Sequence, residues 1–142
     1  MTIRSINEIN EGMQKEIDSL LHELSYTLGK TDLDRVNGLI KDGRLILFVA
    51  ENKNDEIVGI LTLTHCATLT GTKFWIEDVV VTEKSRGLGA GRALVRAAVQ
   101  YTNGISEPHS LYLTSNPSRT AARNLYRSEG FEEYETGVFR IV

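Results

Sequence analysis

The sequence has few of the residues that cross-link small proteins or bind metals. It has one cysteine, Cys66, so no disulfide can form within the chain. Prolines are also few, with two in the whole sequence. Its three histidines, His22, His65 and His109, are far apart and do not recur at a metal-ligand spacing such as HxxxH. We therefore expect no metal site, and we expect a reducing compartment, where unpaired thiols are usual.

The sequence also lacks an excess of one charge and any long apolar run. Its 16 basic and 19 acidic residues give a net charge of −3, without the basic stretch of a nucleic-acid-binding protein. No segment approaches the ~18 uninterrupted apolar residues of a membrane span. The first ten residues include Arg4 and Glu8 and have no apolar run of signal-peptide length. These absences predict a cytoplasmic protein with no nucleic-acid or membrane partner.

The length and composition are those of an ordinary globular domain. The chain has 142 residues, of which 41% are hydrophobic and 25% are charged. It contains no internal repeat, low-complexity tract or composition break that would mark a linker. The sequence therefore predicts a single domain over residues 1–142.

The hydrophobic pattern predicts a series of strands and helices. Ser5 and Glu8 have the spacing of a capping box that begins a first helix, and Thr31 and Asp34 repeat that spacing for a second helix, which Gly43 ends. The other predicted elements are a strand at 2–6, two strands joined by the turn NKND after Arg44, a strand at 73–82, a helix at 89–103, a strand at 110–114, a helix at 117–128 stopped by Gly130, and one or two closing strands in 131–142.

This order implies an α+β fold in three layers, α/β/α, with a mixed, mostly antiparallel sheet between helices. The strand at 73–82 has apolar residues on both faces, which is typical of a central strand. The closing segment GVFRIV, residues 137–142, can pair within the chain or across a homodimer. The sequence leaves that choice open.

A glycine-rich turn joins the strand at 73–82 to the next helix. Its glycines, Gly87, Gly89 and Gly91, lack a Cβ, so backbone N–H groups can converge on an anion at the positive end of the helix. A P-loop would need Lys after the last glycine, where this chain has Arg92, and the glycine spacing does not fit a dinucleotide-binding turn. The turn therefore predicts a pyrophosphate site that is neither a P-loop nor a dinucleotide-binding turn. The alternative is a turn that only connects the strand to the helix.

Val81 to Gly91 read V-x-x-x-x-R-G-x-G-x-G before an apolar helix and resemble the acyl-CoA-binding motif of the GNAT acetyltransferases. The order of the predicted elements is also similar to that family over nearly the whole chain. The resemblance implies acetyl-CoA as cosubstrate, with its pyrophosphate on the turn and its pantetheine amides along the strand edge. The residues implied to bind it here are Val79, Val80, Val81, Arg86, Gly87, Leu88, Gly89, Ala90, Gly91 and Arg92.

A second segment is similar to the GNAT signature A-x-x-L-Y-x-x-x-G-F, with Ala122, Leu125, Tyr126, Gly130 and Phe131. The resemblance implies that the phenol of Tyr126 lies near the CoA sulfur and protonates or stabilises the departing thiolate; the alternative is a packing residue. Many members have a CoA-contacting asparagine where this chain has Arg119. Asn116, Arg119 and Asn124 are therefore further CoA candidates, although Asn116 before Pro117 also fits a plain helix N-cap.

Two acidic residues, Glu77 and Asp78, interrupt the apolar strand. Neighbouring residues on a strand point to opposite faces unless a bulge intervenes, so one of them is expected in a given cleft. An amine with a pKa near ~10.4 is almost fully protonated at neutral pH, and a general base helps it to react. Glu77 has the spacing before Arg86 that acidic residues have in several GNAT subgroups, and it is the first candidate; Asp78 is the second. A structural ion pair is the alternative.

Together these resemblances imply an N-acetyltransferase that moves an acetyl group from acetyl-CoA to a primary amine of a small molecule, by direct attack in a ternary complex. Acetylation of a protein N-terminus or lysine is one alternative, and a non-catalytic acyl-CoA-binding module is another. The stretch IEDVVV also resembles the same strand of glucosamine-6-phosphate acetyltransferases, but no sugar-phosphate site accompanies it. Trp75 either lines the acceptor cleft or belongs to the core.

Overall fold

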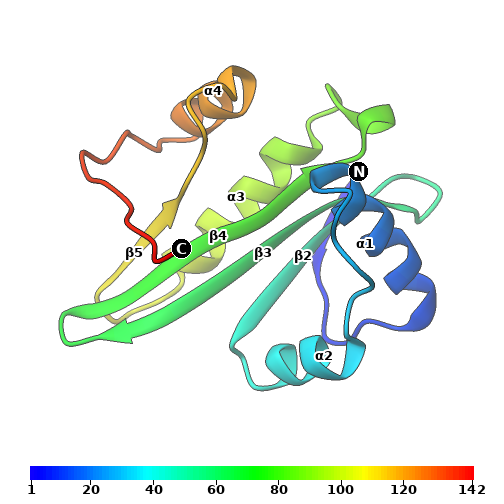
Figure 1. Ribbon diagram of the computed structural model, residues 1–142, viewed down its shortest axis with the longest axis horizontal. Coiled ribbons are helices and arrows are strands. Elements are labelled where there is room, and N and C mark those ends of the chain that lie inside the picture. The colour runs from blue at the N-terminus through cyan, green and yellow to red at the C-terminus, as the bar shows by residue number, and fades with distance from the viewer.

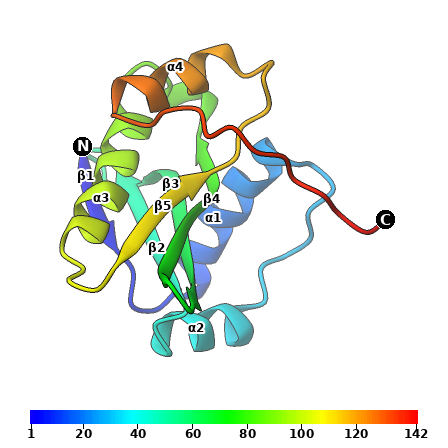
Figure 2. The same ribbon diagram turned by 90° about the vertical axis from the view of Figure 1, so that its left-hand side faces the viewer.

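The computed structural model, which describes residues 1–142, contains a five-stranded sheet with helices on both faces (Figures 1 and 2). The elements in chain order are β1 (Thr2–Ser5), α1 (Glu11–Leu24), α2 (Leu33–Lys41), β2 (Leu45–Glu51), β3 (Ile57–Thr68), β4 (Gly71–Val81), the 3₁₀ turn η1 (Glu83–Ser85), α3 (Ala90–Asn103), β5 (His109–Leu113) and α4 (Thr120–Ser128). The predicted α+β class is confirmed. None of the helices has the length and apolar character needed to cross a bilayer.

The strands lie in the order β1-β2-β3-β4-β5, antiparallel from β1 to β4, with β5 parallel to β4. The pairing of β4 with β5 covers residues 72–76 and 109–113. Beyond it β4 continues to Val81, whereas the chain after β5 turns away toward α4, as Figure 1 shows. The second half of β4 therefore has an unpaired edge, which faces α4.

Two apolar cores lie on the two faces of the sheet. On one face Leu61 and Leu63 of β3 pack against Leu94 of α3. On the other face Val49 and Ile60 pack with residues of α1 such as Leu20. Figure 2 shows α3 on the opposite side of the sheet from α1 and α2, so the predicted three layers are present.

The first two helices begin at N-cap residues other than those predicted. Ser5 lies in β1, and α1 is capped by Asn10, whose side chain accepts a hydrogen bond from the N–H of Met13 (2.9 Å). The cap of α2 is Asp32, while the hydroxyl of Thr31 donates to Asp18. Both predicted capping boxes are therefore wrong, because other side-chain oxygens within a few residues satisfy the free N–H groups.

The C-terminal part of the chain also differs from the prediction. The Asn116 side chain accepts from the N–H and hydroxyl of Ser118 (2.9 and 2.8 Å), so it closes a turn, and α4 begins only at Thr120. The helix ends before Gly130, as predicted. Residues 131–142 form no strand, so the predicted closing strands are wrong. Val138, Phe139, Ile141 and Val142 are all exposed, so no strand or core of this chain packs against them.

Candidate active site

The glycine turn presents an open, uncapped helix N-terminus. Gly87 and Gly89 have φ values of +78° and +87°, in the left-handed region that favours glycine. A Cβ added at either position would meet no atom within 4 Å, so the space above the turn is open. No side chain caps α3, unlike α1 and α2. The first N–H groups of α3 thus lack an intrahelical partner and suit an anion.

A cavity of about 520 Å³ lies beside this turn, between the end of α1, the unpaired half of β4 and α4. Its lining residues are Glu23, Leu24, Val79, Val80, Val81, Arg86, Gly91, Arg119, Ala122, Leu125 and Tyr126. The volume is within the ordinary range of small-molecule sites. The cavity brings together the predicted strand edge, two of the predicted arginines and the predicted tyrosine. Asn116 and Asn124 are exposed and do not line it.

The three predicted arginines have different surroundings. Arg86 and Arg119 lie in the cavity wall, and the Nε of Arg86 donates to the carbonyl of Val81 (3.3 Å). The Arg92 guanidinium instead pairs with Glu129 and donates to the hydroxyl of Ser128 (2.9 Å). The side chain of Arg92 therefore contacts the end of α4 rather than the cavity.

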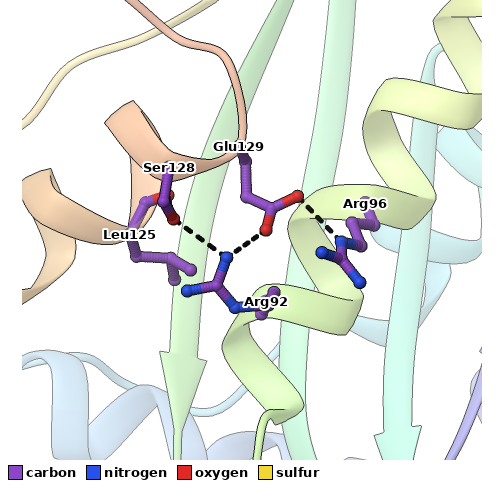
Figure 3. A network of polar contacts seen from close by, with 5 residues as sticks. All are labelled: Arg92, Arg96, Leu125, Ser128 and Glu129. Atoms are coloured by element: carbon purple, nitrogen blue, oxygen red, sulfur yellow. Dashed lines mark hydrogen bonds and ion pairs between the residues drawn. The ribbon is translucent and has the colours of Figure 1, made fainter.

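Figure 3 shows the network that Arg92 belongs to. The Glu129 carboxylate lies between two guanidinium groups of α3, those of Arg92 and Arg96, and the Nε of Arg96 donates to it at 2.8 Å. The hydrogen bond from Arg96, with that from Arg92, holds the pKa of Glu129 below its ordinary value. The network fixes the C-terminal end of α4 to the first half of α3.

Tyr126 lies on α4 one turn before this network. Its side chain is 7% exposed and packs edge-on against Phe131, with ring centroids 6.2 Å apart. Because Tyr126 also lines the cavity, its ring is fixed by packing on one side and faces the cavity on the other.

A β-bulge carries the two acidic residues of β4. Thr62 of β3 is opposite Glu77 and Ile60 is opposite Val80, so two β4 residues, Asp78 and Val79, face one residue of β3. Asp78 has a φ of +35°, which is uncommon for a residue with a side chain. Its carboxylate accepts a hydrogen bond from the Thr62 hydroxyl (3.0 Å). The bulge thus directs Glu77 and Asp78 toward the same face, which the sequence left open.

Glu77 is the acidic residue whose pKa is raised. Partial burial raises it first, and the neighbouring charge of Asp78 adds to the effect. Glu77 and Asp78 do not line the cavity; they precede its wall at Val79 along β4. A raised pKa is the property expected of a carboxylate that acts as a general base. The sequence could not single out Thr62, whose hydroxyl donates to Asp78, because threonine is common inside strands.

The Acetyltransferase (GNAT) family has a sequence model that matches residues 13–131. The chain belongs to the GNAT acetyltransferase family. Members of this family are acyltransferases that use acetyl-CoA as cosubstrate. An N-alpha-acetyltransferase of Sulfurisphaera tokodaii is 30% identical over 103 residues, 66% of this chain, and the match spans 60% of the length of that relative.

Solved structures of similar fold cover nearly the whole of this GNAT chain. A transcriptional regulator from Bacillus halodurans C-125 has a TM-score of 0.82 at 25% identity, with 99% of each chain covered. A putative acetyltransferase from Agrobacterium tumefaciens has a TM-score of 0.78 at 26% identity, with 100% of this chain and 99% of that chain covered.

One cavity residue of this GNAT protein was missed by the sequence analysis. Glu23 accepts a hydrogen bond from the N–H of Glu83 (2.9 Å), which with nearby Arg86 and Lys84 lowers its pKa. It ties the last turn of α1 to η1, at the start of the glycine turn. An acidic residue in the last turn of a helix is unfavourable to the helix dipole, and that conflict was the available signal.

Proposed function

We propose that this GNAT protein transfers an acetyl group from acetyl-CoA to the primary amine of a small molecule, by direct attack in a ternary complex. The observation that carries the proposal is the 520 Å³ cavity, which joins the unpaired edge of β4 to Tyr126 beside the uncapped glycine turn. An acyl-CoA has a matching order of groups: a pyrophosphate, an amide chain and a thioester.

The proposed cosubstrate contacts follow that order. Backbone N–H groups of Gly87 to Arg92 bind the pyrophosphate, because they are free and lie at the positive end of α3. Arg86 and Arg119 add charge-assisted hydrogen bonds from the cavity wall. The unpaired edge at residues 79–81 pairs with the pantetheine amides, as an added strand would. The Arg92 side chain contributes through Glu129 and α4 instead.

The proposed chemical step needs no covalent enzyme intermediate. The amine nitrogen attacks the thioester carbonyl carbon, so that a C–N bond forms and the C–S bond breaks. Glu77, directly or through water, takes the proton that the amine loses. Tyr126 donates a proton or a hydrogen bond to the departing thiolate. The products are an N-acetyl amine and CoA.

A second candidate is acetylation of a protein N-terminus. The match to the Sulfurisphaera tokodaii protein favours it, because that relative is an N-alpha-acetyltransferase. It needs the same cosubstrate site and the same proton transfers. The two candidates differ in the acceptor alone.

Calorimetric titration with acetyl-CoA tests the cosubstrate site. Gly89→Glu places a carboxylate where the phosphates would bind, in open space and at positive φ. Gly43→Glu is the matched control, because Gly43 also has positive φ, +72°, with open space around it, and lies just after α2. We expect binding by the wild type and Gly43→Glu and its loss in Gly89→Glu. Folded wild-type protein that binds no acetyl-CoA would contradict the proposal.

A further inference from the structure

An aromatic surface, which we call the aromatic shelf, lies next to the acidic bulge. It consists of Trp75 of β4, Tyr112 of β5 and Tyr134 of the C-terminal segment. Trp75 and Tyr112 are neighbours in the parallel register, and their rings stack with centroids 4.9 Å apart and planes 28° apart. Tyr134 lies against Tyr112 at 5.9 Å and is 70% exposed. Three rings from distant parts of the chain thus form one partly exposed surface.

The aromatic shelf and Glu77 lie on the same face of the sheet. Phe74 and Ile76 point into the core beside α3, so Trp75 and Glu77, which alternate with them along β4, point to the other face. Two residues along a strand are about 6.6 Å apart. That spacing corresponds to a short alkyl chain between a ring and an amine.

Three groups therefore follow one another along β4. Trp75 carries the aromatic shelf, Glu77 and Asp78 follow at the bulge, and residues 79–81 form the cavity wall proposed to hold the pantetheine. An acceptor with its ring on the shelf places its amine at the carboxylates, next to the thioester end of the cavity. The strand fixes both the order and the spacing.

The charges around the aromatic shelf select among amines. The two carboxylates at one end attract a single ammonium group, and the exposed parts of the shelf rings offer apolar contact to an aromatic ring. At the Tyr112 end the Nζ of Lys73 lies 6.0 Å from the ring centroid. A second ammonium on the acceptor would be repelled by Lys73, and a phosphate would find one lysine close to two carboxylates. Polyamines and amino-sugar phosphates therefore fit poorly.

We infer that the acceptor is an aryl-alkyl primary amine without a second cationic group, whose ring packs against Trp75 and Tyr112 while its amine meets Glu77. This inference rests on the proposed function. It assigns Trp75 and Tyr112 as specificity-determining residues, and it places Trp75 outside the core.

The test measures acetyl-CoA binding first and then thiol release with phenethylamine, tryptamine, spermidine and glucosamine-6-phosphate. We expect kcat/KM for the two aryl-alkyl amines to exceed that for the other two at least tenfold. Trp75→Ala and Tyr112→Ala should each raise KM for phenethylamine about tenfold, which corresponds to the loss of about 1.4 kcal/mol of aromatic contact. Trp75→Phe is the matched control, which keeps a ring and should keep KM within about threefold.

The outcomes separate this inference from the proposed function. A protein that binds acetyl-CoA but prefers spermidine or glucosamine-6-phosphate, or accepts none of the four amines, overturns the inference and leaves the cosubstrate site intact. Folded alanine variants with unchanged KM also overturn it. Acetyl-CoA affinity should be the same in all variants, because the aromatic shelf lies outside the cavity. Absence of acetyl-CoA binding by the wild type rejects both proposals.

Discussion

At the scale of single residues, the raised pKa of Glu77 connects proposed catalysis with stability. A carboxyl group whose pKa is higher in the folded than in the unfolded state binds more protons when folded. The free energy of unfolding then falls as pH rises from the ordinary pKa to the raised one. At neutral pH the ionised Glu77 therefore destabilises the fold slightly, which is a common property of functional residues.

Glu77→Gln should lose activity and gain stability at neutral pH. We expect kcat to fall about 100-fold, the usual scale of general-base catalysis, with partial recovery at high pH, where more of the amine is neutral. The melting temperature at pH 7 should rise above that of the wild type, and the difference should disappear near pH 4. Rates and thermal melts across pH measure both effects.

Asp78→Asn is the matched comparison for this prediction. Removing the Asp78 charge lowers the pKa of Glu77, so the rise of the rate with pH should begin at lower pH. A larger loss of kcat in Asp78→Asn than in Glu77→Gln would assign the base to Asp78.

Tyr126→Phe tests the proposed acid. We expect turnover to fall about tenfold or more, because the thiolate loses its proton donor. The melting temperature should change little, since the buried ring and its contact with Phe131 remain. Thiol-release assays and thermal melts check this. A variant with full turnover would make Tyr126 a packing residue only.

The residues of the site differ in how far the sequence could predict them. Gly87, Gly89 and Tyr126 lie in contiguous motifs, so the sequence alone could single them out. The structure gives the two glycines positive φ and puts Tyr126 in the cavity wall, while their roles stay predictions. The face of the sheet toward which the Asp78 side chain points could not be predicted, because a bulge depends on the register between β3 and β4. The partner of Arg92 was hidden for a similar reason. Glu129 is 37 positions away, and the contact requires α3 and α4 to be packed first.

At the scale of elements, Glu129 holds α4 against α3. A carboxylate whose pKa is lowered in the folded state stabilises the fold above its ordinary pKa and loses this effect as pH falls through the lowered value. Because Tyr126 lies one turn earlier on α4, the same contact positions the proposed acid relative to the glycine turn.

Glu129→Gln should therefore lower the melting temperature at pH 7 by a few degrees, and the difference from the wild type should shrink at pH values below the ordinary carboxyl pKa. Glu133→Gln is the control, since Glu133 is 71% exposed and its pairs with Arg123 and Arg127 should contribute little. Thermal melts at two pH values and two salt concentrations measure the effect. Equal shifts in both variants would contradict a special role for Glu129.

For the helices and strands, the sequence could predict type and order better than the residues at which the helices begin. Type and order were predictable for the strands from β1 to β5 and for all four helices, since periodicity is a local property. The helix starts were not, because several side chains near each start can cap it. Asn10 and Asp32 do so in the structure, whereas Ser5 is held in β1 by its pairing with Phe48.

At the scale of the whole molecule, the last residues stand apart from the rest. Val138, Phe139, Ile141 and Val142 are all at least 78% exposed, and the last backbone hydrogen bond made outside the helices and strands is donated by Phe131. Deletion of residues 135–142 should therefore change the free energy of unfolding by less than about 0.5 kcal/mol. Urea titration of both forms measures this, and light scattering should give both the same oligomeric state.

A truncated protein that is monomeric where the full chain is dimeric would contradict this prediction. It would assign residues 135–142 to the homodimer interface that the sequence left open. The shelf residue Tyr134 remains in the truncated chain, so amine preference should be the same in both forms.

The divergence of β4 and β5 has a further consequence for the dynamics of the protein. β3 is paired along both edges, whereas β5 is paired along one edge over five residues. Segments with so few links open locally without unfolding of the remainder, and their amide hydrogens exchange early. A cosubstrate that bridges β4 and α4 would suppress this local opening and slow exchange of the β5 amide hydrogens, because a ligand that binds only the closed form stabilises that form. The GNAT fold of this chain would then become fully cooperative only when its cosubstrate is bound.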